Sequence, residues 1–116
     1  SVSTMARLQD LVQTITLNAK LDESREFAEM VQGALEQNLR ALNPELRNLG
    51  VKQAPFVVLI GAHMPSVLAE ISFLSNPKEA RLLKQDAYRQ QIAQALFDAV
   101  QNYQDTLKNV QVAARP

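Results

Sequence analysis

The predicted fold depends on two apolar segments, Pro55-Phe56-Val57-Val58-Leu59-Ile60 and Val67-Leu68-Ala69-Glu70-Ile71-Ser72-Phe73-Leu74, which a short turn separates. Five consecutive apolar residues, as in the first segment, are typical of a strand that is covered on both faces. We therefore predict an α/β layer with two adjacent strands, 55–61 and 67–73, covered by helices. The predicted fold class is α/β.

Glu70 is the exception in the second segment, because it places a carboxylate inside an apolar run. Taking a lone carboxylate out of water costs about 1–3 kcal/mol even with partial compensation, and more when it stays charged. Buried carboxylates of this kind are enriched at active sites. A glutamate at a strand end, satisfied by backbone amides or an arginine, is an equally good interpretation.

Helical patterns precede the predicted strands. Apolar residues recur at helical spacing between Met5 and Ile15, and a stronger stripe runs through residues 22–42. Pro44 should end this second helix, because a proline disfavours helical conformation at the residue before it.

Further helices are predicted after the strands. Asn76, Pro77 and Glu79 are typical of a helix start, as cap, first residue and partner of the cap amide. Apolar residues spaced three or four apart predict a last helix over 87–103, followed by a polar tail at 105–116. Residues 1–116 are thus expected to form a single domain with about four helices.

Composition limits the classes of function. The chain has 116 residues, of which 47% are hydrophobic, and its 12 basic and 12 acidic residues are well mixed. Mixed charges argue against nucleic-acid binding, which needs a concentrated basic face, and against a polybasic membrane anchor. No apolar stretch approaches the length of a transmembrane helix. The absence of cysteine excludes disulfides and thiolate metal ligands.

Few other residues suggest chemistry. His63 is the single histidine, and without cysteines it could hold zinc only together with carboxylates, so we interpret it as a solvated loop residue. Lys52 and Gln53 precede the first predicted strand and are candidates for substrate binding, although polar residues often introduce a strand. The residues alone predict an α/β domain with one unusual carboxylate.

Two longer motifs are similar to a known family. They read Gly50-Val51-Lys52-Gln53-Ala54-Pro55-Phe56-Val57-Val58-Leu59 and Met64-Pro65-Ser66-Val67-Leu68-Ala69-Glu70-Ile71-Ser72-Phe73-Leu74-Ser75-Asn76-Pro77. They resemble the type-3 N-acetylmuramoyl-L-alanine amidases, zinc-dependent bacterial cell-wall hydrolases, whose pattern is G-V-K-Q-A-x-F-x-V-L and then M-P-x-V-L-x-E-x-G-F-x-S-N-P. Residues 21–28 and 88–93 are similar to helices on either side of that pattern. The resemblance implies that the two predicted strands are part of a mixed sheet flanked by helices.

The resemblance implies a reaction and a role for Glu70. The reaction is hydrolysis of the amide between N-acetylmuramic acid and the L-alanine of the peptidoglycan stem peptide. Glu70 would be the general base and acid beside zinc, the cofactor that activates the attacking water. The zinc ligands of the family, two histidines and a glutamate, match no residue of this chain, which therefore looks like the C-terminal half of an amidase domain. Ser72 stands where the family usually has glycine.

Three interpretations stay open. The chain is part of a competent amidase, or an inert remnant whose unpaired strand edges favour dimers, or a helical protein-binding module that uses the stripe between Phe27 and Leu42. The resemblance also implies the bacterial cell envelope as location, periplasmic or secreted, and a protein activator as a partner. For residues 5–17 we favour packing in the core over the autoinhibitory helix that some members insert near this point.

Overall fold

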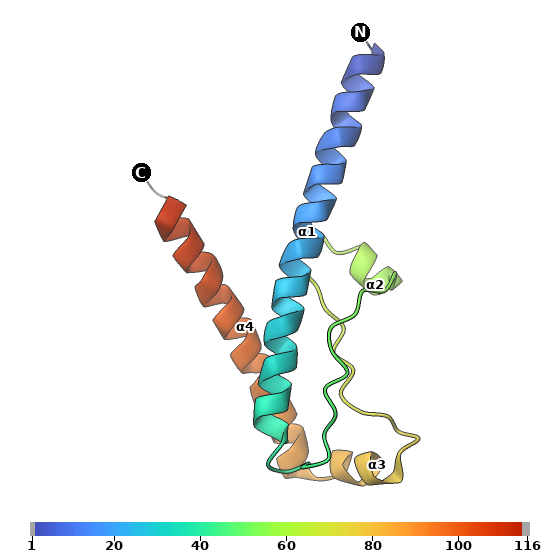
Figure 1. Cartoon of the computed structure of the whole chain (residues 1–116), viewed down its shortest axis with the longest axis vertical. Coiled ribbons are helices and arrows are strands. Elements are labelled where there is room, and N and C mark those ends of the chain that lie inside the picture. The colour runs from blue at the N-terminus through green and yellow to red at the C-terminus, as the bar shows by residue number, and fades with distance from the viewer. Residues whose placement is uncertain (1, 115–116) are drawn as a thin grey trace.

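The computed structural model describes residues 2–114, and all its regular elements are helices (Figure 1). They are α1 (Val2–Leu39), α2 (Val57–Ile60), α3 (Pro77–Leu83) and α4 (Asp86–Ala114). Residues 2–114 contain no strand. The predicted α/β fold is therefore wrong for this chain, whereas helices are found in each region where a helix was expected.

The first predicted strand, residues 55–61, forms the single helical turn α2. The backbone N–H groups of Leu59 and Ile60 both donate to the carbonyl of Phe56 at 3.0 Å. A strand needs a neighbouring strand for its N–H and C=O groups, and residues 2–114 supply none here. The apolar run satisfies its backbone locally instead, which leaves the Val57 side chain 86% exposed.

The second predicted strand, residues 67–73, is extended but unpaired. The peptide groups of residues 67–72 make no hydrogen bond to any described residue. Successive side chains of an extended segment point to opposite sides. Val67 and Ala69 accordingly pack against the core, and Leu68 and Glu70 are exposed. The possible dimer through unpaired strand edges stays a prediction.

The core lies between the second half of α1 and the first half of α4. The two helices run antiparallel, since the Nδ2 of Asn43 donates to the hydroxyl of Tyr88 at 3.4 Å and the rings of Phe27 and Tyr103 stack at 4.9 Å. Apolar side chains at helical spacing meet along this line. The buried residues of the cluster are Val31, Leu35, Leu39, Tyr88, Ile92, Ala95 and Ala99.

This packing also bears on the stripe of residues 27–42. Val31, Leu35 and Leu39 are buried against α4, so most of the stripe proposed for the alternative protein-binding module packs in the core, while Leu42 at its end is 41% exposed. On the facing side of α4, Ala95 and Ala99 are both fully buried. Small side chains at these positions leave room for the facing helix to pack closely.

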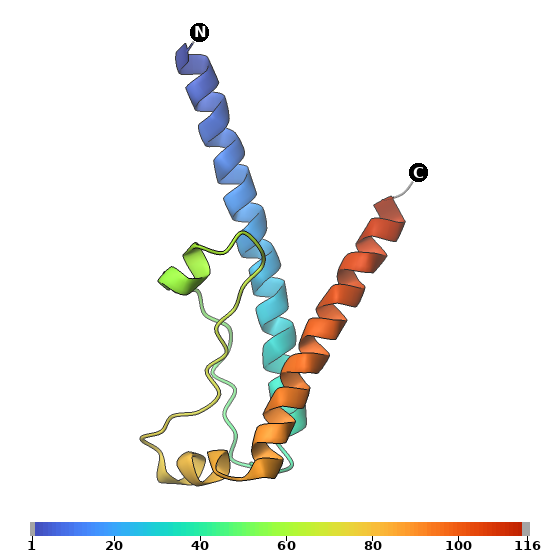
Figure 2. The same ribbon diagram turned by 180° about the vertical axis from the view of Figure 1, so that it is seen from behind.

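Beyond this contact the helices diverge, and the molecule is an open V (Figures 1 and 2). The Cα radius of gyration is 18.4 Å, whereas a compact chain of this length has about 13 Å. The expectation that residues 5–17 pack in the core is wrong for this chain. The large apolar side chains of this arm are all more than half exposed: Met5, Leu8, Leu11, Val12, Ile15 and Leu17.

Helix ends follow local chemistry, with some shifts from the prediction. α1 is one continuous helix that ends at Leu39, before Pro44. α4 continues to Ala114, so most of the predicted tail at 105–116 is helical, and residues 115–116 lie outside the described part. Gly50 has φ of +83°, in the left-handed region where glycine is favoured.

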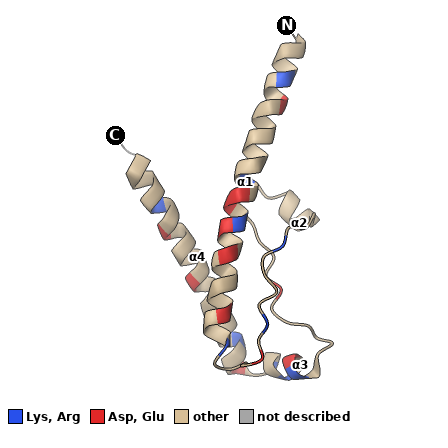
Figure 3. Cartoon of the chain, viewed as in Figure 1, with Lys and Arg blue, Asp and Glu red and all other residues tan. Residues whose placement is uncertain are grey.

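Charged side chains are scattered over the helices and loops (Figure 3). The middle of α1 and its neighbouring loops carry acidic and basic residues side by side, while the N-terminal arm of α1 is almost uncharged. Among the described residues, no helix combines the length and the apolar character that crossing a membrane requires.

Candidate active site

Glu70 lies in the extended segment between α2 and α3, and its side chain is exposed. The expectation of a carboxylate buried in an apolar strand is therefore wrong for this chain. The reason is the alternation along residues 67–70: Val67 and Ala69 contact the core, so Glu70 points to the opposite side. An exposed carboxylate needs no compensating partner, and solvent or a ligand can reach it.

The segment that carries Glu70 is held at its two ends by side chains. At the first end, the backbone N–H of Ser66 donates to the Oγ of Ser24 in α1 at 3.0 Å. At the other end, the backbone N–H of Phe73 donates to the Oε2 of Glu79 in α3 at 2.7 Å. Glu70 lies between these anchors.

A second group of contacts closes the turn before Glu70. The Nζ of Lys20 donates to the carbonyl of Leu59 at 2.8 Å, and the Oγ of Ser66 donates to the same carbonyl at 3.4 Å. Lys20 and Ser24 are four residues apart, and so lie on one face of α1. Together they hold residues 59 and 66, at the two ends of the turn, against α1.

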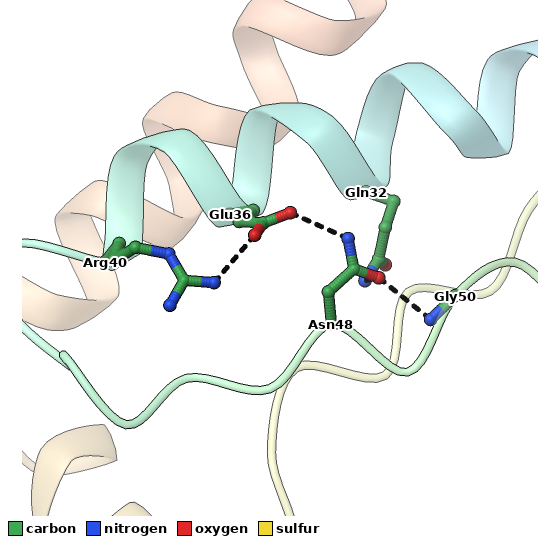
Figure 4. Close-up of polar contacts among 5 residues, drawn as sticks. All are labelled: Gln32, Glu36, Arg40, Asn48 and Gly50. Carbon is green, nitrogen blue, oxygen red and sulfur yellow. Dashed lines mark hydrogen bonds and ion pairs between the residues drawn. The ribbon is translucent and has the colours of Figure 1, made fainter.

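Lys52 and Gln53, the candidates for substrate binding, are both exposed. They follow a loop that polar contacts fix to α1 (Figure 4). The Oδ1 of Asn48 accepts hydrogen bonds from Nε2 of Gln32 at 2.6 Å and from the N–H of Gly50 at 2.8 Å. No hydrogen bond or ion pair joins either candidate to Glu70 within the described residues.

The same loop involves an acidic residue with a lowered pKa. The Nδ2 of Asn48 donates to the Oε2 of Glu36 at 2.7 Å, and Arg40 donates to Oε1 at 2.7 Å (Figure 4). The hydrogen bond from Asn48, and then that from Arg40, lower the pKa of Glu36 below its ordinary value. Both contacts favour the ionised carboxylate.

The donor set of the chain does not fit a zinc site. His63 is exposed in the turn after α2, as predicted for a solvated loop residue. In the part of the chain that the structure describes, no three His, Cys, Asp or Glu side chains cluster so that they could hold a metal ion. Protein zinc sites use three or four such ligands. We therefore assign no metal ligand to this chain.

Ser24 and Asn48 are site residues that the sequence reasoning missed. Ser24 lies within residues 21–28, which resemble a helix of the amidase family, and Asn48 stands two residues before the Gly50 motif. Both positions could have been singled out as short polar side chains next to a matching motif. The partners of these side chains could not have been predicted, because Ser24 and Ser66, for example, are 42 residues apart in the chain.

Comparison with known proteins gives one consistent result. The sequence profile of a family described as N-acetylmuramoyl-L-alanine amidase matches residues 10–102. The chain is 41% identical over 99 residues to the amidase AmiC of Neisseria meningitidis serogroup B, which covers 85% of this chain and 22% of AmiC. No solved structure was found to match it.

Two other relatives carry the same description. AmiA of Escherichia coli K12 is 39% identical over 98 residues, covering 83% of this chain and 30% of the relative. LytC of Bacillus subtilis 168 is 40% identical over 80 residues, covering 69% of this chain and 15% of the relative. The chain thus spans less than a third of the length of each of these relatives.

Proposed function

Because this chain belongs to the N-acetylmuramoyl-L-alanine amidase family, we propose that it is the portion of a peptidoglycan amidase that carries Glu70. The observation behind the proposal is that the family match spans residues 10–102, which include the whole motif around Glu70. In this proposal residues 1–116 are part of one domain, its C-terminal half, and the enzyme works in the bacterial cell envelope.

The proposed reaction is hydrolysis of the amide that links the lactyl group of N-acetylmuramic acid to L-alanine. Water attacks the carbonyl carbon and the C–N bond breaks, which leaves a carboxylic acid and an amine. Glu70 takes the proton of the attacking water and gives it to the departing nitrogen, as a general base and then a general acid. Its exposed position in the chain supports this role, because a substrate can reach it.

Zinc is the cofactor expected for the family, but the residues of this chain do not fit a zinc site. We therefore propose that this portion supplies the proton-transferring carboxylate and not the metal ligands. For the isolated chain we expect no amidase activity, since the chain alone holds only part of the proposed site.

Lys52 and Gln53 are proposed to contact the substrate. Both are exposed, and they follow the Asn48 loop that α1 holds in place. Their polar side chains suit the hydroxyls, amides and carboxylates of peptidoglycan.

The test is Glu70→Gln in the complete amidase, measured as release of stem peptides with a free L-alanine amine from purified peptidoglycan. Loss of general acid–base catalysis should lower kcat by about 10²–10⁴-fold. Glu29→Gln is the matched control, because Glu29 is exposed on α1 and makes no hydrogen bond or ion pair to the described residues of the segment that carries Glu70. A Glu70→Gln enzyme with the activity of that control would overturn the proposed role.

A further inference from the structure

The segment that carries Glu70 is not held by a hydrogen-bond ladder. The peptide groups of residues 67–72 make no hydrogen bond to any described residue, although the segment is extended. Val67 and Ala69 contact the core only through apolar side chains. Apolar contacts are not directional, so they do not fix the position of the segment along its own axis. The axial position of Glu70 therefore depends on what holds the two ends of the segment.

The end before Glu70 is held by α1. Ser24 accepts the N–H of Ser66 at 3.0 Å, and Lys20 donates to the carbonyl of Leu59 at 2.8 Å. Ser24, Ser66, Lys20 and Leu59 are all half-buried, so water competes less for these bonds than at the surface. The side chains of Lys20 and Ser24 are about one helical turn apart on α1. They contact the first and the last residue of the connection 59–66.

We propose that Ser24, with Lys20 beside it, is a positioning residue for Glu70, an inference that rests on the proposed function. The hydroxyl of Ser24 does not touch the substrate. It fixes the backbone four residues before Glu70, so that the carboxylate stands at the right distance from the amide to be cut. A misplacement of about 1 Å at a reacting group can cost about 10²-fold in rate.

The experiment uses Ser24→Ala in the complete amidase, with a soluble muropeptide as substrate. We expect kcat to fall by at least about tenfold with KM nearly unchanged, because the carboxylate is displaced while the substrate contacts remain. Ser24→Thr keeps the hydroxyl and should recover most of the lost kcat. Thr14→Ala is the matched control: it also removes a hydroxyl from α1, but the Oγ1 of Thr14 bonds only to Asp10 of the same helix.

Hydrogen exchange supplies a readout that does not depend on activity. In Ser24→Ala the amide of Ser66 should exchange faster than in the parent protein, while in Thr14→Ala it should not change. A purely structural role would instead lower the midpoint of urea unfolding and leave kcat per folded molecule unchanged, which would overturn the proposal. If Ser24→Ala does not fold, kcat and the hydrogen exchange of the Ser66 amide are measured in Lys20→Met instead. The same outcomes then decide the proposal.

The two proposals fail in different ways. Unchanged kcat in Ser24→Ala, together with an inactive Glu70→Gln enzyme, overturns the positioning role and leaves the proposed function standing. Full activity in Glu70→Gln overturns the proposed function, and the positioning role falls with it.

Discussion

At the scale of single residues, Tyr103 has an unusual combination of contacts. Its ring stacks on Phe27 at 4.9 Å with 27° between the ring planes, which contributes to the α1–α4 packing. Its hydroxyl is buried and finds no hydrogen-bond partner in the described residues. Burial raises the pKa of Tyr103 above its ordinary value of 10.0, and the negative charges of Glu23 and Glu26 add to the increase.

Tyr103→Phe should therefore leave the free energy of unfolding unchanged or raise it by up to about 1 kcal/mol at pH 7, because it removes an unsatisfied polar group and keeps the ring. Tyr88→Phe is the matched control, since the Tyr88 hydroxyl accepts a hydrogen bond from Asn43. That change should cost about 1 kcal/mol. Urea unfolding measures both, and a larger loss in Tyr103→Phe would mean that the hydroxyl has a partner.

The raised pKa of Tyr103 has a consequence at alkaline pH. The folded state binds the phenol proton more tightly than the unfolded state, so its stabilising contribution is present below pH 10.0 and is lost as pH rises through the raised pKa. The unfolding free energy of the parent chain should thus fall more steeply above pH 10.0 than that of Tyr103→Phe. If the free energy of unfolding fell equally steeply with pH in the two proteins, the raised pKa of Tyr103 would be contradicted.

At the scale of elements, α3 illustrates how a short helix depends on its first turn. The Oδ1 of Asn76 accepts the N–H groups of Lys78 at 3.0 Å and of Glu79 at 3.3 Å, and Pro77 occupies the first helical position. The predicted cap at Asn76 is confirmed. Glu79 differs from the prediction, because it accepts from Phe73 and not from the cap amide.

Asn76→Ala should destabilise α3 by about 1 kcal/mol, because two backbone donors of its first turn lose their acceptor. Asn76→Asp keeps the acceptor and should retain the helix. Hydrogen exchange of the Lys78 and Glu79 amides measures the effect on the helix itself. Equal protection in Asn76→Ala and the parent chain would show that the cap contributes nothing.

At the scale of the whole molecule, packing is concentrated where α1 and α4 meet. Leu39 is 2% exposed within that core, whereas Leu11 on the N-terminal arm of α1 is 57% exposed. The two leucines lie in the same helix, so intrinsic helix propensity does not distinguish them. The two leucines differ because α4 packs against Leu39 and not against Leu11.

Leu39→Ala should lower the free energy of unfolding by about 2–5 kcal/mol, through lost burial and a residual cavity. Leu11→Ala on the exposed arm should change it by less than about 0.5 kcal/mol. Urea unfolding followed by circular dichroism compares the two. Similar losses would mean that the arm of α1 packs against something in solution.

Helices were predictable from the sequence, whereas residues 55–73 were not. The apolar stripe of α1, the proline after it and the cap of α3 act within a few residues of one another. Strand formation in residues 55–61 and 67–73 depends on a partner strand elsewhere in the chain, which local patterns do not reveal. The apolar runs were identified correctly, but their conformation was not.

The candidate site divides in a similar way. Glu70 was singled out from an apolar run and a motif, but its expected burial was wrong, because only the location of the core determines which side chains of an extended segment face inward. Ser24 and Asn48 were missed, since their roles depend on contacts between residues far apart in the chain.

The sequence by itself determined the regions of the three longer helices, the cap of α3, and the family to which the chain belongs. These properties depend on neighbouring residues and on motifs. The sequence did not determine that α4 continues to Ala114. Tertiary structure alone decided that residues 57–60 coil into a turn, that Glu70 faces outward, and that α1 holds the turn before it. The physical reason is that backbone pairing, burial and long-range hydrogen bonds require partners that come together only in the folded chain.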